Sequence, residues 1–247
     1  MGSHTSASNV IITASAGFAI VAAASVAIGV ALDASALYVV KAVVLFAAIA
    51  AVVVASVRDG HPYATFGAAN TVTLARAACV TLIAALVGER ASAMSAVVII
   101  VVASGITALD GLDGRLARHT TMASAFGARF DMETDALLIL ALSILTWQHG
   151  KAGAWIVLSG LMRYLFIVAG WTWPCMRQPL PPSFRRKAVC VAQIVALLVA
   201  LLPSVALPAS TAVAATSLAL LAWSFGVDTL WLWRAPTGAT AIAGVND

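Results

Sequence analysis

Long apolar stretches recur along the whole chain and are separated by short polar segments. A helix that crosses a bilayer needs about 20 apolar residues, and eight stretches qualify or nearly do. They predict spans at Val10–Leu32, Ala36–Val57, Thr71–Val87, Ala93–Leu109, Thr134–Gln148, Ala154–Trp173, Ala188–Leu202 and Ala209–Trp233. None shows the regular alternation of apolar and polar residues that a membrane β-barrel needs. The pattern therefore predicts an all-α, polytopic transmembrane helical bundle.

Composition supports this prediction, because 62% of the residues are hydrophobic and only 10% are charged. A soluble domain has roughly 45–50% apolar and about 25% charged residues. Charges this sparse cannot cover a water-facing surface, so a soluble globular fold is excluded. The net charge of +4 does not indicate a nucleic-acid partner in such a chain.

The basic residues of the loops are distributed unequally between the two sides of the predicted bundle. One set of loops carries Arg58, Arg115, Arg118, Arg129, Arg177, Arg185, Arg186, Lys187 and Arg234, whereas the opposite set carries Arg90 and Lys151. Cytoplasmic loops of membrane proteins are enriched in Lys and Arg. The bias therefore predicts that both termini and the 110–135 region lie on the cytoplasmic side.

Acidic residues gather between the fourth and fifth predicted spans. Five of the ten in the chain lie there: Asp110, Asp113, Asp131, Glu133 and Asp135. Residues three or four apart share one face of a helix, so the four aspartates form two pairs that a connecting turn could bring together. Converging carboxylates repel one another and are costly to desolvate. Two hard divalent cations would resolve both problems and could clamp the phosphates of a nucleoside diphosphate.

Small and basic residues between the two aspartate pairs suit the same chemistry. Gly114 provides a tight turn and close backbone approach, and Ala117 keeps the floor of the site open. Arg118 can hold a phosphate through a forked contact, and Gly127 permits close approach of the following helix. Glu133 is two residues from each neighbouring aspartate and is expected to lie off their face, so it receives no role.

The segment from Asp110 to Asp135 resembles the signature of the CDP-alcohol phosphotransferase family. That signature reads Asp, two residues, Asp-Gly, two residues, Ala-Arg, eight residues, Gly, three residues, Asp, three residues, Asp, and every fixed position is present. A second element, Asn70-Thr-Val-Thr73-Leu-Ala-Arg76, resembles the segment that opens the first core helix of the family. The alternative of a carboxylate cation site in a transporter explains the acids but not the intervening Gly, Ala and Arg.

The resemblance implies a role for each matching residue. Asp110, Asp113 and Asp131 would bind one Mg²⁺ or Mn²⁺ ion, and Asp110, Asp131 and Asp135 a second. Asp135 would also be the general base that takes the proton of the acceptor hydroxyl, whose oxygen attacks the β-phosphorus and releases CMP. The CDP group would be bound by Asn70, Thr73, Arg76, Gly114, Ala117, Arg118, Ser124 and Gly127.

The resemblance also divides the chain into two parts. Residues 61–247 would form the six-helix catalytic core, and residues 1–60 two additional N-terminal transmembrane helices about which the family says nothing. The family often forms homodimers, so a homodimer is one option for this chain, but no residue in the sequence indicates an interface. We expect an integral protein of a bacterial inner membrane that contacts membrane lipids. Its active site would face the cytoplasm.

Four basic residues outside the signature are candidates for binding the acceptor. Arg163 lies inside the sixth predicted span, where it could bind a phosphate or pair with Asp228 in the last span. Arg185, Arg186 and Lys187 open the seventh span, where they could anchor the chain to anionic lipid or hold a phosphate of the acceptor. Both alternatives stay open for each group.

The leading hypothesis is an enzyme of phospholipid synthesis that transfers a phosphatidyl group from CDP-diacylglycerol to a small hydroxylated acceptor. One alternative has a soluble CDP-alcohol of the CDP-choline type as donor and a lipid alcohol as acceptor. A cation transporter with a carboxylate site is the alternative from another class. The signature serves both kinds of donor and leaves the acceptor unidentified.

Overall fold

The fold comes from a computed structural model, which describes residues 3–58, 67–116, 125–178, 180–181 and 183–234. Helices account for nearly all of these residues, and no strand occurs among them, so the prediction of an all-α bundle is confirmed. The helices are α1 (Ser3–Leu32), α2 (Ala36–Arg58), α3 (Ala68–Ala84), α4 (Ala93–Leu116), α5 (Ala125–Gln148), α6 (Val157–Thr172), α7 (Phe184–Leu201) and α8 (Ala209–Arg234). Short 3₁₀ turns, Ala154–Ile156 and Pro174–Arg177, flank α6.

Several helices extend beyond the apolar stretches that predicted them. Helix α4 continues through Leu116, α5 begins at Ala125 and α7 begins at Phe184, whereas apolar counting stopped at the first charged turn. A helix can continue past the hydrocarbon region, because water and polar side chains tolerate its charged turns. Helix α3 has the predicted length but lies three residues earlier: it begins at Ala68 and ends at Ala84, before a turn that contains Gly88 at φ 82°.

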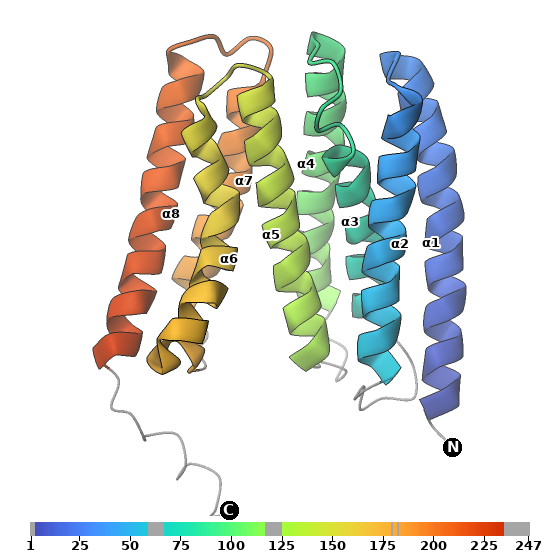
Figure 1. The fold of residues 1–247 in the computed structure, drawn as a ribbon, viewed down its shortest axis with the longest axis horizontal. Coiled ribbons are helices and arrows are strands. Elements are labelled where there is room, and N and C mark those ends of the chain that lie inside the picture. The colour runs from blue at the N-terminus through green and yellow to red at the C-terminus, as the bar shows by residue number, and fades with distance from the viewer. Residues whose placement is uncertain (1–2, 59–66, 117–124, 179, 182, 235–247) are drawn as a thin grey trace, which may run out of the picture.

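The helices lie side by side, with α1 and α2 at one edge, α6, α7 and α8 at the other, and α3, α4 and α5 between them (Figure 1). The C-terminal ends of α2 and α4 and the N-terminal ends of α3 and α5 lie at the same end of the bundle. This arrangement brings the two halves of the acidic signature to one end of the molecule.

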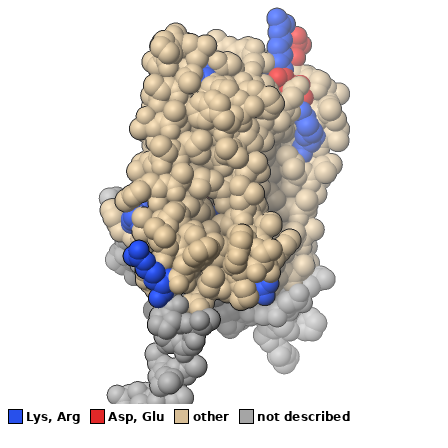
Figure 2. Space-filling model, turned by 60° about the vertical axis from the view of Figure 1, so that its left-hand side comes forward, with Lys and Arg blue, Asp and Glu red and all other residues tan. Residues whose placement is uncertain are grey.

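The outer surface is suited to a membrane. Four segments are long and apolar enough to cross one: Val10–Leu32, Ala36–Ser56, Ala154–Thr172 and Ala209–Arg234. Shorter apolar segments lie at Ala69–Ala84 and Ala93–Leu109. Figure 2 shows charged side chains near the two ends and a broad uncharged surface between them. The chain is therefore an integral membrane protein; that the other helices also cross stays a prediction.

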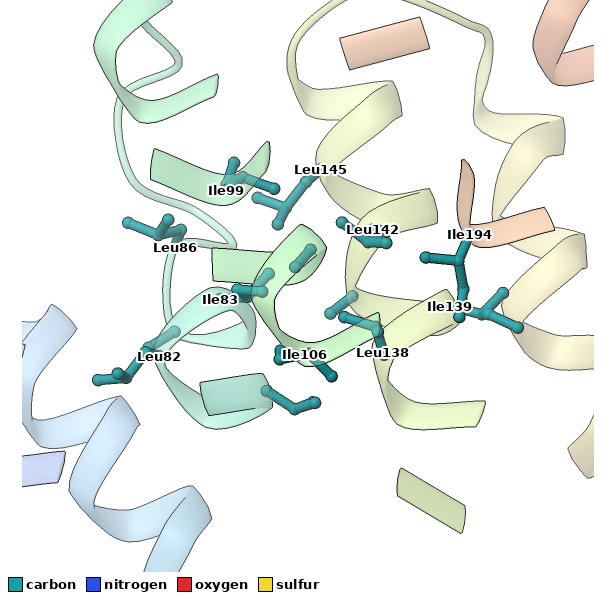
Figure 3. Packing of buried hydrophobic residues seen from close by; sticks show 14 of the residues in the cluster. Leu82, Ile83, Leu86, Ile99, Ile106, Leu138, Ile139, Leu142, Leu145 and Ile194 are labelled. Carbon is teal, nitrogen blue, oxygen red and sulfur yellow. The ribbon is translucent and has the colours of Figure 1, made fainter. Parts of the chain in front are cut away.

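Helix α5 forms the centre of the bundle, in contact with α3, α6 and α7. Its buried side chains Leu138, Leu142 and Leu145 pack near Ile83 of α3 and Ile99 of α4 (Figure 3). On its other side, Ile139 lies beside Ile194 of α7. A helix that is apolar on several faces is buried by its neighbours, and this burial fixes how the polar first turns of α5 are presented.

A glycine brings α6 unusually close to α5. A Cβ atom at Gly160 would lie 2.4 Å from the Cα atom of Leu140, so even alanine would force the two helices apart. Small residues at helix interfaces in membranes allow this kind of backbone approach. The contact places the following turns of α6 against the N-terminal half of α5.

The two N-terminal helices are fastened to α3 and the loop after it. The hydroxyl of Tyr38 donates a hydrogen bond to the carbonyl of Leu82 at 3.2 Å. Lys41 Nζ donates to the carbonyl of Val87 at 2.8 Å and to Glu89 Oε1 at 2.7 Å. Glu89 also accepts hydrogen bonds from the amide and hydroxyl of Ser35, at 3.0 and 2.9 Å. Glu89 thus joins the α1–α2 turn to the core through three donors.

We expect Glu89→Gln to lower the free energy of unfolding by about 1–3 kcal/mol, the scale of one or two hydrogen bonds to a charged group. Burial raises the pKa of Glu89, but the bonds from Lys41 and Ser35 outweigh burial and hold it below its usual value of 4.5. The ionised form is therefore favoured by folding. This stabilisation is full above pH 4.5 and is lost as the pH falls through the lowered pKa.

Thermal unfolding in detergent from pH 7 down to pH 3.5 tests this expectation. The wild-type midpoint should fall more steeply at acidic pH than that of Glu89→Gln. Arg90→Gln, a change at an exposed position in the same loop, is the control and should follow the wild type. Equal midpoints for Glu89→Gln and the wild type at pH 7 would refute the stabilising role of Glu89.

Candidate active site

The first turns of α3 carry a buried polar face. Asn70 and Thr73 are each 6% exposed and Arg76 is 1% exposed, and the three lie at successive spacings of three residues. The Thr73 hydroxyl donates to the carbonyl of Ala69 at 3.1 Å within the helix. Buried polar groups in a membrane are costly and usually functional. The second sequence element therefore lies inside the bundle, as a pocket wall requires.

Arg76 connects this face to two of the signature aspartates. Its Nη1 atom donates to Asp131 Oδ1, and its Nη2 atom donates to Asp135 Oδ1 at 2.5 Å. Asp131 and Asp135 lie one turn apart on the first half of α5, with side chains 39% and 23% exposed. One guanidinium contacts both aspartates, so they lie on one face of α5, as predicted.

The other aspartate pair belongs to α4. Asp110, Asp113 and Gly114 lie within its last turns, but the structure does not describe the side chains of the two aspartates. Placing Gly114 in a tight turn was wrong, because α4 remains helical through Leu116. Gly127 lies in the first turn of α5. Three predicted CDP contacts fall outside the described residues: Ala117, Arg118 and Ser124.

The donor chemistry of the described aspartates fits the predicted divalent ions. Mg²⁺ and Mn²⁺ favour carboxylate oxygens, and Asp131 and Asp135 offer two partly exposed carboxylates side by side. Within the described side chains, no group of three or more His, Cys, Asp or Glu could hold a metal ion. A complete site would need ligands from the last turns of α4.

Arg163 has a different partner from the one considered in sequence. Its Nη2 atom donates to Glu133 Oε1. From the sequence, a pairing of Arg163 with Asp228 was the alternative to phosphate binding, and that pairing is wrong. Glu133 is two residues from both Asp131 and Asp135, so it points away from their face, as predicted. The Nε atom of Arg163 is buried and has no hydrogen-bond partner among the described residues.

The basic cluster that opens α7 contacts the end of α8. Arg185 donates to Asp228 Oδ1 and to both oxygens of Ser224, at 2.6 Å for the carbonyl and 2.7 Å for the hydroxyl. Its guanidinium also lies 5.7 Å from the ring centre of Trp223. Arg186 Nη1 approaches the same carboxylate at 3.4 Å, and Lys187 is exposed. The cluster therefore joins α7 to α8. Its three positive charges exceed the single negative charge of Asp228.

Sequence reasoning missed two features of the interior. The contact of Arg76 with Asp131 and Asp135 joins residues more than fifty positions apart, and no local pattern indicates it. Gln193 of α7 is 1% exposed, and neither polar atom of its amide has a hydrogen-bond partner among the described residues. A lone polar residue in an apolar run was the signal that could have identified Gln193.

Comparison with known proteins agrees with this geometry. A family model described as CDP-alcohol phosphatidyltransferase matches residues 66–227, which include α3 to α7 and most of α8 and exclude α1 and α2. No curated protein and no solved structure matches the chain.

Proposed function

Because the chain belongs to the CDP-alcohol phosphatidyltransferase family, we propose that it transfers a phosphatidyl group from CDP-diacylglycerol to a small hydroxylated acceptor and releases CMP. As a member of that family it is a membrane transferase of substituted phosphate groups. The observation that carries the proposal is the pair Asp131 and Asp135, presented together on α5 and held by Arg76 from α3. Both elements of the family's pattern are thus in contact.

The four aspartates of the signature have defined parts in this reaction. Asp135 takes the proton from the acceptor hydroxyl, and the acceptor oxygen forms a bond to the β-phosphorus. The bond from that phosphorus to the oxygen that bridges to the α-phosphorus breaks, and CMP leaves with the electron pair. Two Mg²⁺ or Mn²⁺ ions, when bound by Asp110, Asp113, Asp131 and Asp135, supply the positive charge that offsets the diphosphate.

The donor would be oriented by residues from two helices and the segment between α4 and α5. Asn70 and Thr73 of α3, with Gly127 of α5, contact the CDP group in this proposal. Gly114, Ala117, Arg118 and Ser124 complete the pocket. The acyl chains would remain among membrane lipids, since the face of the bundle in Figure 2 is uncharged between its two ends.

An anionic acceptor, such as a phosphorylated alcohol, is supported by the surplus of basic residues. Arg185, Arg186 and Lys187 carry three positive charges, and Asp228 offsets one of them. Arg163 retains a buried Nε donor beside its bond to Glu133. Guanidinium groups hold phosphates through paired donors, so these residues are the proposed acceptor contacts.

We further propose that the active site faces the cytoplasm of a bacterial inner membrane. The C-terminal ends of α2 and α8 and the N-terminal end of α5, which carry Arg58, Arg234 and Arg129, lie at the same end of the bundle (Figure 1). Arg90 and Lys151 belong to loops at the opposite end. An excess of basic residues marks the cytoplasmic side.

CMP release by the purified chain in detergent tests the function. Release is expected with CDP-diacylglycerol, a divalent cation and an acceptor from a panel of alcohols and phosphorylated alcohols. Release that requires CDP-choline and diacylglycerol would instead establish the alternative donor. Failure to release CMP from every CDP-alcohol, combined with cation-dependent flux in liposomes, would replace the enzyme with a transporter.

A further inference from the structure

Arg76 and the two aspartates of α5 that it contacts differ in their exposure to solvent. The side chain of Arg76 is 1% exposed, whereas the side chains of Asp131 and Asp135 are partly exposed. The carboxylates therefore contact a buried guanidinium and also present surface to solvent. A ligand that arrives from water meets the carboxylates before it can meet Arg76.

We propose that Arg76 is a positioning residue for the metal ligands and not a contact to the CDP group. This inference rests on the proposed function, since it assumes that Asp131 and Asp135 bind divalent ions. Arg76 contacts the Oδ1 atom of each aspartate, and a carboxylate can accept bonds at both of its oxygens. Outer hydrogen-bond partners of this kind orient the ligands of a metal and sustain its affinity.

The alternative is that Arg76 takes the place of the metal and must be displaced by it. Burial argues against this alternative. Displacement would separate the guanidinium from both carboxylates inside the bundle, and breaking a buried ion pair is strongly destabilising. If Arg76 keeps its contacts to the two Oδ1 atoms, the guanidinium stays paired whether or not a cation is bound.

The geometry also explains why arginine occupies this position. A guanidinium is planar and presents its two terminal nitrogens as a fork, so one side chain can bind two carboxylates one helical turn apart. A lysine ammonium carries the same charge at a single point. The fork fixes the separation of Asp131 and Asp135, which two ions with shared ligands would require.

Binding of Mn²⁺ to the full-length protein in detergent, measured by electron paramagnetic resonance, tests the inference without an activity assay. Arg76→Gln is expected to weaken Mn²⁺ binding about 10–100-fold, the usual effect of removing an outer partner of a metal ligand. Arg76→Lys should weaken it less, because it keeps the charge but loses the fork. Simple repulsion between cations predicts the opposite sign, since Arg76→Gln removes a positive charge.

Arg163→Gln is the matched control, because it removes a guanidinium that binds α5 through Glu133. Its Mn²⁺ affinity should stay near that of the wild type, because Glu133 points away from Asp131 and Asp135 and is not a predicted metal ligand. Unchanged or tighter binding by Arg76→Gln would overturn the positioning role. Should Arg76→Gln not fold, wild-type affinity in Arg76→Lys would overturn it equally.

The same measurements separate this inference from the proposed function. A wild-type chain that binds Mn²⁺ and releases CMP, with Arg76 variants that bind Mn²⁺ normally, refutes only the role of Arg76. A wild-type chain that binds no Mn²⁺ refutes the metal site and, with it, this role.

Discussion

Asp135→Asn should lower CMP release by at least about a thousandfold while CDP-alcohol binding is largely retained. A positioned general base contributes about 10²–10⁴-fold to rate, and Asp135 is proposed to be both this base and a metal ligand. The amide of asparagine cannot accept the acceptor's proton. Its oxygen can still accept the hydrogen bond from Arg76 Nη2, so the fold around the site should survive.

Two quantities are measured in the same detergent: the rate of CMP release, and the affinity for the donor by calorimetry. Glu133→Gln is the control, because Glu133 belongs to the same helix and points toward Arg163. Its rate of CMP release should stay within about tenfold of the wild type if Glu133 is no base. Full activity in Asp135→Asn would show that another group takes the proton.

The sequence predicts this site well where the information is local. Spacing alone places Asp131 and Asp135 on one face of α5 and turns Glu133 away, because helical periodicity is the same inside and outside a membrane. The apolar stretches likewise predict the number and order of the long helices among the residues that the structure describes. Their ends were predicted less well, since hydropathy reports burial in lipid and not where the backbone stops being helical.

Partner choice across the bundle could not be predicted from the sequence. Asp228 was considered as a partner of Arg163 from the sequence, yet Arg163 pairs with Glu133. Asp228 pairs with Arg185 instead. Any of these arginines could neutralise either acid, and only the packing of α6 against α5 at Gly160 and of α7 against α8 decides between them. The partners of Arg76 could not be predicted from the sequence either. The motif that contains Arg76 indicated a contact with CDP, and the structure shows contacts with the carboxylates of Asp131 and Asp135.

Removal of divalent cations should abolish both donor binding and CMP release. Asp135→Asn, in contrast, should lose CMP release and keep donor binding. The four predicted ligands, Asp110, Asp113, Asp131 and Asp135, carry four negative charges, and Arg76 offsets one. A donor diphosphate is itself negative and would be repelled by the remaining three charges. Cations bound between them are therefore needed before the donor can enter, and not only during phosphoryl transfer.

Treatment with a chelator, followed by dialysis, should reduce CMP release more than about a thousandfold, because bound cations offset the charge of the whole site. Donor binding should become undetectable under the same conditions. Excess Mg²⁺ or Mn²⁺ should restore both, which excludes unfolding as the cause. Donor binding that persisted without cations would mean that protein groups alone hold the diphosphate. In that case the arginines of the site, rather than its aspartates, would dominate recognition of the donor.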